Sequence, residues 1–113
     1  MSKETLLLST TVNGVKFYCD RLYLSKLEVN ESLFTEPEPS NKFDIHAVKL
    51  LAPSHTDPPV KIMLGYVPAK VSQIIAALLN LIPLTFKVTA VNPGTMEVFI
   101  DISTPYLREE DHA

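Results

Sequence analysis

Alternation of apolar and polar side chains recurs along the chain and predicts strands with one buried face. Residues 5–12 (TLLLSTTV) and 46–52 (HAVKLLA) are rich in threonine and aliphatic side chains, and we expect the second segment to be a buried strand. Residues 60–66 (VKIMLGY) predict a further strand, which the proline-rich loop at 53–59 separates from the one before it. A hairpin with a long loop is therefore expected over 46–66. The apolar face of its second strand comprises Val60, Ile62, Leu64 and Tyr66.

Two more alternating segments, 84–92 and 95–103, flank Asn92-Pro93-Gly94, which is a turn by composition. Earlier in the chain, Asn13-Gly14 is a strong turn signal that either joins two strands or marks a bulge. Residues 32–43 predict the end of a strand followed by a loop, because their two prolines lack backbone donors and do not fit inside a sheet. The shared face of the last strand comprises Met96, Val98, Ile100 and Ile102.

The clearest helical periodicity lies in residues 68–82 (PAKVSQIIAALLNLI). Pro68 suits the first helical position, and Pro83 ends the pattern. Apolar side chains recur with the i, i+3, i+4, i+7 spacing of one buried stripe, so we expect a helix over about 68–81. The stripe comprises Val71, Ile74, Ile75, Leu78, Leu79 and Ile82.

About six short strands and one main helix indicate a mainly β protein. Antiparallel strands with a single helix favour a small six-stranded barrel, closed or nearly closed, which the helix at about 68–81 caps through Ile74, Ile75, Leu78 and Leu79. At 113 residues the chain fits a single domain, 1–113, with a core at about 5–103 and a polar tail at 104–113.

Charge and composition narrow the classes of function. The net charge is −3, and residues 104–113 contribute −2 of it, so the body is nearly neutral and lacks the broad basic face of a nonspecific DNA coater. One cysteine, Cys19, excludes an intrachain disulfide, and three scattered histidines do not provide the closely spaced ligands of a structural zinc site. No apolar run approaches a membrane span or a signal-peptide core, so we expect a cytoplasmic protein without cofactors.

Catalysis has one candidate pair. Asp44 and His46 would share a face on a regular strand and could couple as acid and base. The sequence offers neither a nucleophile in a strained turn motif nor, with three glycines, a phosphate-binding loop. We therefore expect a binding protein rather than an enzyme.

Aromatic residues next to lysines are the better candidates for binding. Four aromatics fall at predicted strand ends or loop edges, where exposed rings could stack on nucleic-acid bases. Lysines lie near them and could reach phosphates. The alternative is that the rings pack the rim of the barrel and the lysines are solvated. These residues are Lys16, Phe17, Tyr18, Lys42, Phe43, Tyr66 and Lys70.

Three segments together resemble the HIRAN domain: GVKFY at 14–18, EPSNKFDIHAVKL at 38–50 and LGYVPAKVSQIIAALL at 64–79. They match in order and spacing a Gly-x-x-aromatic-aromatic start, a Glu-Pro-x-Asn-x-aromatic-Asp segment, and a Gly-aromatic-x-Pro turn into a helix. The resemblance covers roughly residues 5–103. It implies an OB-like or SH3-like barrel that binds the 3′ end of single-stranded DNA.

By position, the resemblance makes Asp44 the acid that accepts a hydrogen bond from the terminal 3′-hydroxyl, and Phe43, Phe17 and Tyr18 the aromatics of the pocket. It implies a role in DNA repair or processing, beside a repair ATPase, a nuclease or another protein acting in trans. Asp44 is equally well explained as a turn residue that accepts backbone N–H bonds, and the two roles can coexist.

The sequence departs from the DNA-binding members of the family at several positions. Lys16 stands where they carry Arg, which loses a bidentate contact to phosphate, and Phe43 stands where they often carry Tyr. His46 replaces the commoner Asn. These departures and the acidic charge favour the competing hypothesis of a protein-interaction module. Glu31 and Glu36 precede the motif and Glu38 begins it, and the negative charges of these acids would repel a DNA backbone.

Overall fold

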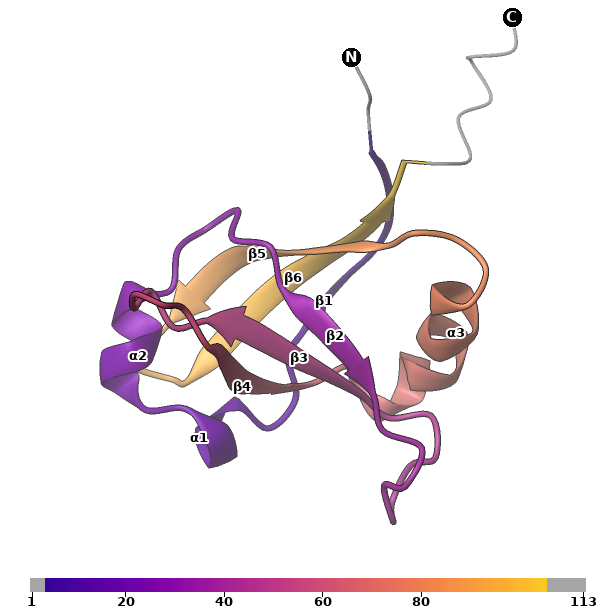
Figure 1. The fold of residues 1–113 in the computed structure, drawn as a ribbon, viewed down its shortest axis with the longest axis horizontal. Helices are drawn as coiled ribbons and strands as arrows, with labels where there is room; N and C mark the ends of the chain where they lie inside the picture. The colour runs from indigo at the N-terminus through magenta and orange to yellow at the C-terminus, as the bar shows by residue number, and fades with distance from the viewer. Residues whose placement is uncertain (1–3, 106–113) are drawn as a thin grey trace, which may run out of the picture.

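Between residues 4 and 105 the chain forms six strands in two antiparallel three-stranded sheets, with three helices at their margins (Figure 1). The computed structural model describes residues 4–105. Its elements, in chain order, are β1 Thr5–Thr11, α1 Val15–Tyr18, α2 Arg21–Lys26, β2 Phe34–Pro37, β3 Val48–Pro53, β4 Lys61–Tyr66, α3 Ala69–Leu79, β5 Thr85–Asn92 and β6 Glu97–Thr104.

The strands are ordered β1-β6-β5 in one sheet and β2-β3-β4 in the other. Isolated bridges, Asn13 with Tyr66 and Ser32 with Lys87, connect the two sheets. The expectation of six antiparallel strands is confirmed, but a single closed or nearly closed barrel is not: within residues 4–105 the strands form two sheets joined by short seams. Strand-by-strand periodicity predicts which face is buried and does not determine how the sheets close.

The core lies between the sheets and consists of the inward side chains of their strands. In β6 the alternation is strict, and Val98, Ile100 and Ile102 are fully buried. Val48 and Leu50 of β3 are likewise fully buried. Burying an aliphatic side chain of this size contributes roughly 1.5–3 kcal/mol to the stability of the fold. The alternating side chains of β3 and β6 therefore stabilise the packing of the two sheets.

Gly65 explains one seam between the sheets. The backbone amide of Tyr66 donates to the Asn13 carbonyl at 2.9 Å, and the Asn13 amide donates to the Tyr66 carbonyl at 2.8 Å. A Cβ at Gly65 would overlap the Asn13 carbonyl oxygen and lie 2.7 Å from Cγ1 of Val12. The absence of a side chain at Gly65 therefore permits this approach of β1 to β4.

Helix α3 confirms the predicted helix, with differences at its ends and on its faces. Pro68 is the N-cap rather than the first helical residue, and Asn80 is the C-cap. Ile75 is buried as expected, whereas Ile74 is 63 % exposed and does not plug the core. Ser72, which the apolar pattern placed off the stripe, is buried. Figure 1 shows α3 on the opposite side of the sheets from α1 and α2, so one helical face contacts the body and the other faces outward.

The sequence pattern predicted neither α1 nor α2. Asn13-Gly14 turns the chain into α1, where Gly14 has a φ of 82°, rather than joining two strands. Asp20 caps α2, its side chain accepting a hydrogen bond from the Tyr23 amide at 2.8 Å. Helices of one or two turns are too short to show an apolar period, and Asp20 was the available signal.

The ends of three predicted strands also move. Pro37 lies in β2, at the edge of its sheet, where a missing N–H is tolerated. β3 begins at Val48 and not at residue 46, because the Ala47 amide donates to the Asp44 carbonyl in a turn. Thr104 belongs to β6 instead of the expected tail, Pro105 follows the strand, and residues 106–113 of that tail lie outside the described residues.

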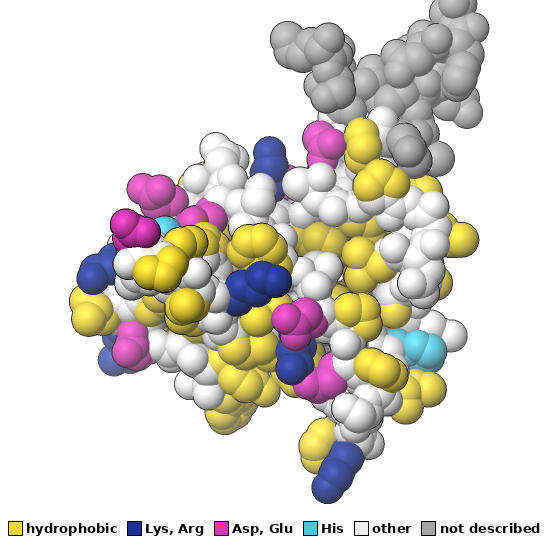
Figure 2. All heavy atoms as spheres, in the orientation of Figure 1, with side chains coloured by type: hydrophobic (Ala, Val, Ile, Leu, Met, Phe, Trp, Pro, Cys, Tyr) yellow, Lys and Arg dark blue, Asp and Glu magenta, His cyan; other side chains and the backbone are white. Residues whose placement is uncertain are grey.

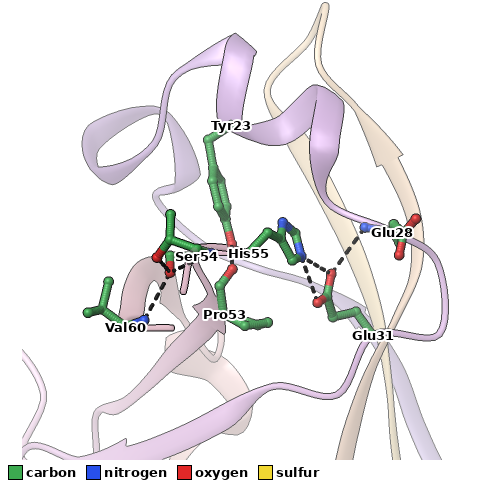
Figure 3. A network of polar contacts seen from close by, with 8 residues as sticks. Tyr23, Glu28, Glu31, Pro53, Ser54, His55 and Val60 are labelled. Carbon is green, nitrogen blue, oxygen red and sulfur yellow. Dashed lines mark hydrogen bonds and ion pairs between the residues drawn. The ribbon is translucent and has the colours of Figure 1, made fainter. Parts of the chain in front are cut away.

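A polar network secures the loop after β3 (Figure 3). The Tyr23 hydroxyl donates to the Pro53 carbonyl at 2.7 Å, which ties α2 to the end of β3. His55 Nε2 lies 3.0 and 2.8 Å from the two carboxylate oxygens of Glu31, and its ring stacks on Tyr23. The amide of Glu28 donates to Glu31 Oε1 at 3.3 Å. The Glu31 carboxylate thus joins the segment between α2 and β2 to the loop after β3, and Tyr23 ties α2 to the same loop.

None of the helices between residues 4 and 105 is long and apolar enough to cross a membrane. The same residues contain no cluster of three or more side chains suited to holding a metal ion.

Candidate functional site

A cleft of about 690 Å³ lies between α1, the β2–β3 loop, and the junction of β4 with α3. In Figure 2 the tip of the β2–β3 loop projects at the bottom of the view and carries hydrophobic and basic side chains. Because α1, the β2–β3 loop and the β4–α3 junction are distant in sequence, only the folded chain brings the walls of the cleft together. Its lining comprises Asn13, Gly14, Phe17, Tyr18, Glu38, Ser40, Asn41, Lys42, Phe43, Asp44, Ala47, Tyr66, Val67 and Ala69.

Aromatic rings line the cleft on two sides. Phe43, at the loop tip, is 97 % exposed, and Phe17 of α1 is 75 % exposed. Tyr18 is 46 % exposed and meets Tyr66 edge to face, with ring centroids 6.0 Å apart. Phe17 and Phe43 are so open to solvent that they contribute little to the core, which argues against the alternative that these two rings only pack a barrel rim.

The Glu-Pro-Ser-Asn-Lys-Phe-Asp segment, residues 38–44, folds around the side chain of Asn41. Asn41 Oδ1 accepts hydrogen bonds from the amides of Phe43 at 2.8 Å and Asp44 at 3.0 Å. Asn41 Nδ2 donates to Glu38 Oε1 at 2.9 Å. An amide side chain both accepts and donates, so Asn41 can shape the turn that presents Phe43.

Glu38 lines the cleft and its carboxylate contacts three other side chains. Its Oε1 also accepts from the Tyr66 hydroxyl at 2.8 Å, and its Oε2 lies 3.0 Å from Lys49 Nζ. Hydrogen bonds from Asn41, Tyr66 and Lys49 lower the pKa of Glu38 to about 2. Burial, followed by the bond to Glu38, raises the pKa of Tyr66, which keeps its hydroxyl protonated as the donor.

Asp44 is partly buried, with its carboxylate tied to two elements. Oδ1 accepts from the His46 amide at 2.9 Å, and Oδ2 accepts from Ser72 Oγ of α3 at 2.6 Å. These two bonds, that of Ser72 first, lower the pKa of Asp44. A carboxylate has about four acceptor positions, so acceptor capacity remains beside the cleft. The turn role is therefore present, and it does not exclude a ligand role.

Asp44 and His46 do not form the pair expected on a strand. They lie in the turn before β3, and their hydrogen bond joins the Asp44 carboxylate to the His46 backbone amide. The expectation that both side chains share one strand face is wrong, because the strand starts two residues later.

The structure brings five of the seven predicted site residues into the cleft lining: Phe17, Tyr18, Phe43, Asp44 and Tyr66. Lys16 and Lys70 are exposed outside that lining. Lys16 Nζ lies 5.3 Å from the centre of the Phe17 ring, and Lys70 follows the lining residue Ala69 in α3.

Four residues important to the geometry were not predicted as site residues. Glu38, Asn41 and Lys49 belong to the motif segment 38–50, where Glu38 was considered only as an acid that would oppose DNA, and Ser72 lies farther along the chain. Glu38 and Asn41 are the acid and the amide of the motif, and their presence in it was the available signal for both. Nothing in local periodicity pairs Ser72 with a side chain 28 positions away.

Comparison with known proteins agrees with this architecture. The family model of the HIRAN domain matches residues 6–104, so the chain belongs to the HIRAN domain family. A structure of a protein from Lactobacillus plantarum superposes with a TM-score of 0.74 at 20% sequence identity, covering 92% of this chain and 97% of that one. The HIRAN domain of human HLTF superposes with a TM-score of 0.61 at 16% identity, covering 96% of this chain and 83% of that one. At these identities the two structures show the shared fold. A search of curated proteins gives no match.

Proposed function

We propose that this domain binds the 3′ end of single-stranded DNA in the aromatic cleft, as a module of DNA repair or processing that performs no catalysis itself. One observation carries the proposal: exposed aromatics from α1 and from the β2–β3 loop line the same cleft as a carboxylate with free acceptor capacity. Base stacking on an aromatic ring contributes about 1–3 kcal/mol per base and tolerates any sequence. The stacking residues would be Phe17, Tyr18, Phe43 and Tyr66.

Asp44 would provide the preference for an end. An ionised carboxylate only accepts hydrogen bonds, so it pairs with a terminal hydroxyl, which can donate. A 3′-phosphate would bring a second anion to Asp44, whose lowered pKa keeps it charged at neutral pH. The same carboxylate can thus favour a free 3′-hydroxyl and disfavour a phosphorylated end.

Few cations are available for the DNA backbone. Lys42 lines the cleft, and Lys16 and Lys70 flank it. We expect affinity in the micromolar range or weaker, near the 10⁻⁴–10⁻⁶ M typical of nonspecific binding. The logarithm of the affinity should fall gently with the logarithm of salt concentration, with a slope of about −0.7 per phosphate contacted.

A protein ligand is the second candidate, and the charge of the lining favours it. The cleft contains two carboxylates, Glu38 and Asp44, and one lysine, Lys42. A peptide that presents hydrogen-bond donors between apolar side chains would suit this surface without phosphate repulsion. A partner protein acting in trans, such as a repair ATPase or nuclease, would then occupy the cleft in place of DNA.

Fluorescence anisotropy with short single strands at low salt tests the proposal. We expect strands with a free 3′-hydroxyl to bind more tightly than 3′-phosphorylated or circular strands of the same composition. Asp44→Ala should remove this difference, since it deletes both the acceptor and the repelling charge. Glu28→Ala is the matched control, because it removes one exposed acid outside the cleft lining.

Equal binding of circular and free-ended strands would overturn the DNA-end proposal, as would the absence of binding at low salt. Either result would leave the protein-interaction function in its place. A loss of end preference in Glu28→Ala equal to that in Asp44→Ala would show that net charge, and not the cleft, determines the preference.

A further inference from the structure

Ser72 is a buried polar residue on a helix that otherwise packs with apolar side chains. It is 1% exposed, and Ser72 and Thr104 are the buried polar side chains among residues 4–105. Placing a hydroxyl in the interior costs free energy unless it is hydrogen-bonded. The partner of Ser72 therefore indicates why a serine occupies this position.

Ser72 Oγ has two acceptors within reach and a single proton to donate. Asp44 Oδ2 lies 2.6 Å away, and the carbonyl oxygen of Ala69 lies 3.1 Å away in the preceding helical turn. Bonds from a hydroxyl to a carboxylate are typically 2.5–2.7 Å and are stronger than bonds between neutral groups. The Ser72 hydroxyl is accordingly assigned as donor to the Asp44 carboxylate. This hydrogen bond joins α3 to the β2–β3 loop across 28 positions of sequence.

The Asp44 carboxylate is held by donors from two independent elements. The His46 amide, in the same turn, fixes Oδ1, and Ser72, on the helix, fixes Oδ2. With one donor alone the carboxylate plane could rotate about the remaining bond. With both donors in place its plane is set, and so are the directions of the acceptor positions that are left.

We propose that Ser72 is a positioning residue, which orients Asp44 for the terminal 3′-hydroxyl. The inference rests on the proposed function and deepens it, since it adds a determinant of end specificity that does not itself line the cleft. Ser72 does not touch the DNA in the proposed complex. It acts by holding the acceptor in the orientation that a hydroxyl donor requires.

The first test measures the contact without DNA. Carboxyl-carbon NMR titration of Asp44 should show a higher pKa in Ser72→Ala than in the wild type, because the donor that favours the charged form is gone. Ser25→Ala is the matched control: Ser25 is also a helical serine, and its hydroxyl donates to the Leu22 carbonyl three residues earlier, in α2. That variant should leave the titration of Asp44 unchanged. An unchanged pKa in Ser72→Ala would overturn the inference.

The second test measures specificity by anisotropy with the same strands as above. Ser72→Ala should reduce the ratio of affinities for 3′-hydroxyl over 3′-phosphate strands by about three- to tenfold, the range of one net hydrogen bond. Its affinity for circular strands should stay at the wild-type value, because stacking and phosphate contacts are untouched. Ser25→Ala should preserve both quantities.

The outcomes separate this inference from the proposed function. A wild-type ratio above one that stays the same in Ser72→Ala would overturn the positioning role alone. A parallel loss of affinity for every strand would also overturn it, since that result indicates a general structural role. A wild-type ratio of one would overturn the proposed function and the inference together.

Discussion

Two loops of this protein are held by carboxylate-centred networks, and the networks differ in what their carboxylates face. In the β2–β3 loop, Glu38 and Asp44 bind donors from the loop, β4 and α3, and both line an open cleft. In the second network, Glu31, from the segment between α2 and β2, binds the Glu28 amide and His55 of the loop after β3, and it does not line that cleft. Both networks pair an acid with nearby aromatic rings.

The difference shows that an acid next to aromatics is not by itself a binding site. Tyr23 stacks on His55 and donates to the Pro53 carbonyl, so its ring and hydroxyl are used inside the network. Phe17 and Phe43 are mostly exposed and are free to receive a planar ligand. We therefore expect changes in the first network to alter binding, and changes in the second to alter stability alone.

The largest effect should come from the helix that braces the first network. Ile75→Ala should lower the free energy of unfolding by about 2–5 kcal/mol, because Ile75 is 2% exposed and its removal leaves a cavity beside α3. Ile74→Ala is the matched control on the next residue, which is 63% exposed, and it should change stability by less than about 0.5 kcal/mol. Urea denaturation measures both, and equal losses would contradict the packing of α3.

A smaller effect is expected when the second network is broken. His55→Ala should lower the free energy of unfolding by about 1 kcal/mol, because Glu31 loses its ring partner while remaining near solvent. Binding of single strands should be unchanged, since neither residue lines the cleft. Urea denaturation and anisotropy on the same samples test this, and a loss of DNA affinity in His55→Ala would abolish the distinction between the two networks.

The smallest effect should be a pH dependence specific to Glu38. Its pKa is about 2 in the folded protein against an ordinary 4.5, so its charged form stabilises the fold above pH 4.5, and that contribution is lost as the pH falls toward 2. Glu38→Gln should therefore be less stable than the wild type at neutral pH and approach it near pH 2. Urea midpoints across this range measure the difference, and a gap independent of pH would refute the role of the charge.

The buried face of β6 and the presence of α3 are predictable from the sequence for a physical reason. Alternation in residues 95–103 determines which side chains of β6 are buried, because a strand has only two faces. The periodicity of 68–82 predicted α3 but not its orientation, since the apolar stripe spans more of the helix than the sheets cover. Ile74 was therefore placed inside and Ser72 outside, the reverse of their positions in the structure.

The candidate site was predictable to the extent that it resides in a continuous motif. Phe43 and Asp44 came from the resemblance of residues 38–50 to the HIRAN pattern. The contacts of Glu38 with Tyr66 and Lys49, and of Asp44 with Ser72, join residues that only the folded chain brings together. A single sequence contains no local signal for such long-range pairs.

The central claim is that a DNA end occupies the cleft beside Asp44 and not the network around Glu31. Amide chemical-shift perturbation by a short single strand with a free 3′-hydroxyl, at low salt, tests this residue by residue. We predict shifts at residues 14–18, 41–46 and 66–69, with residues 28–31 and 54–57 unchanged. Shifts centred on 28–31 and 54–57, or no shifts with excess strand, would contradict the claim.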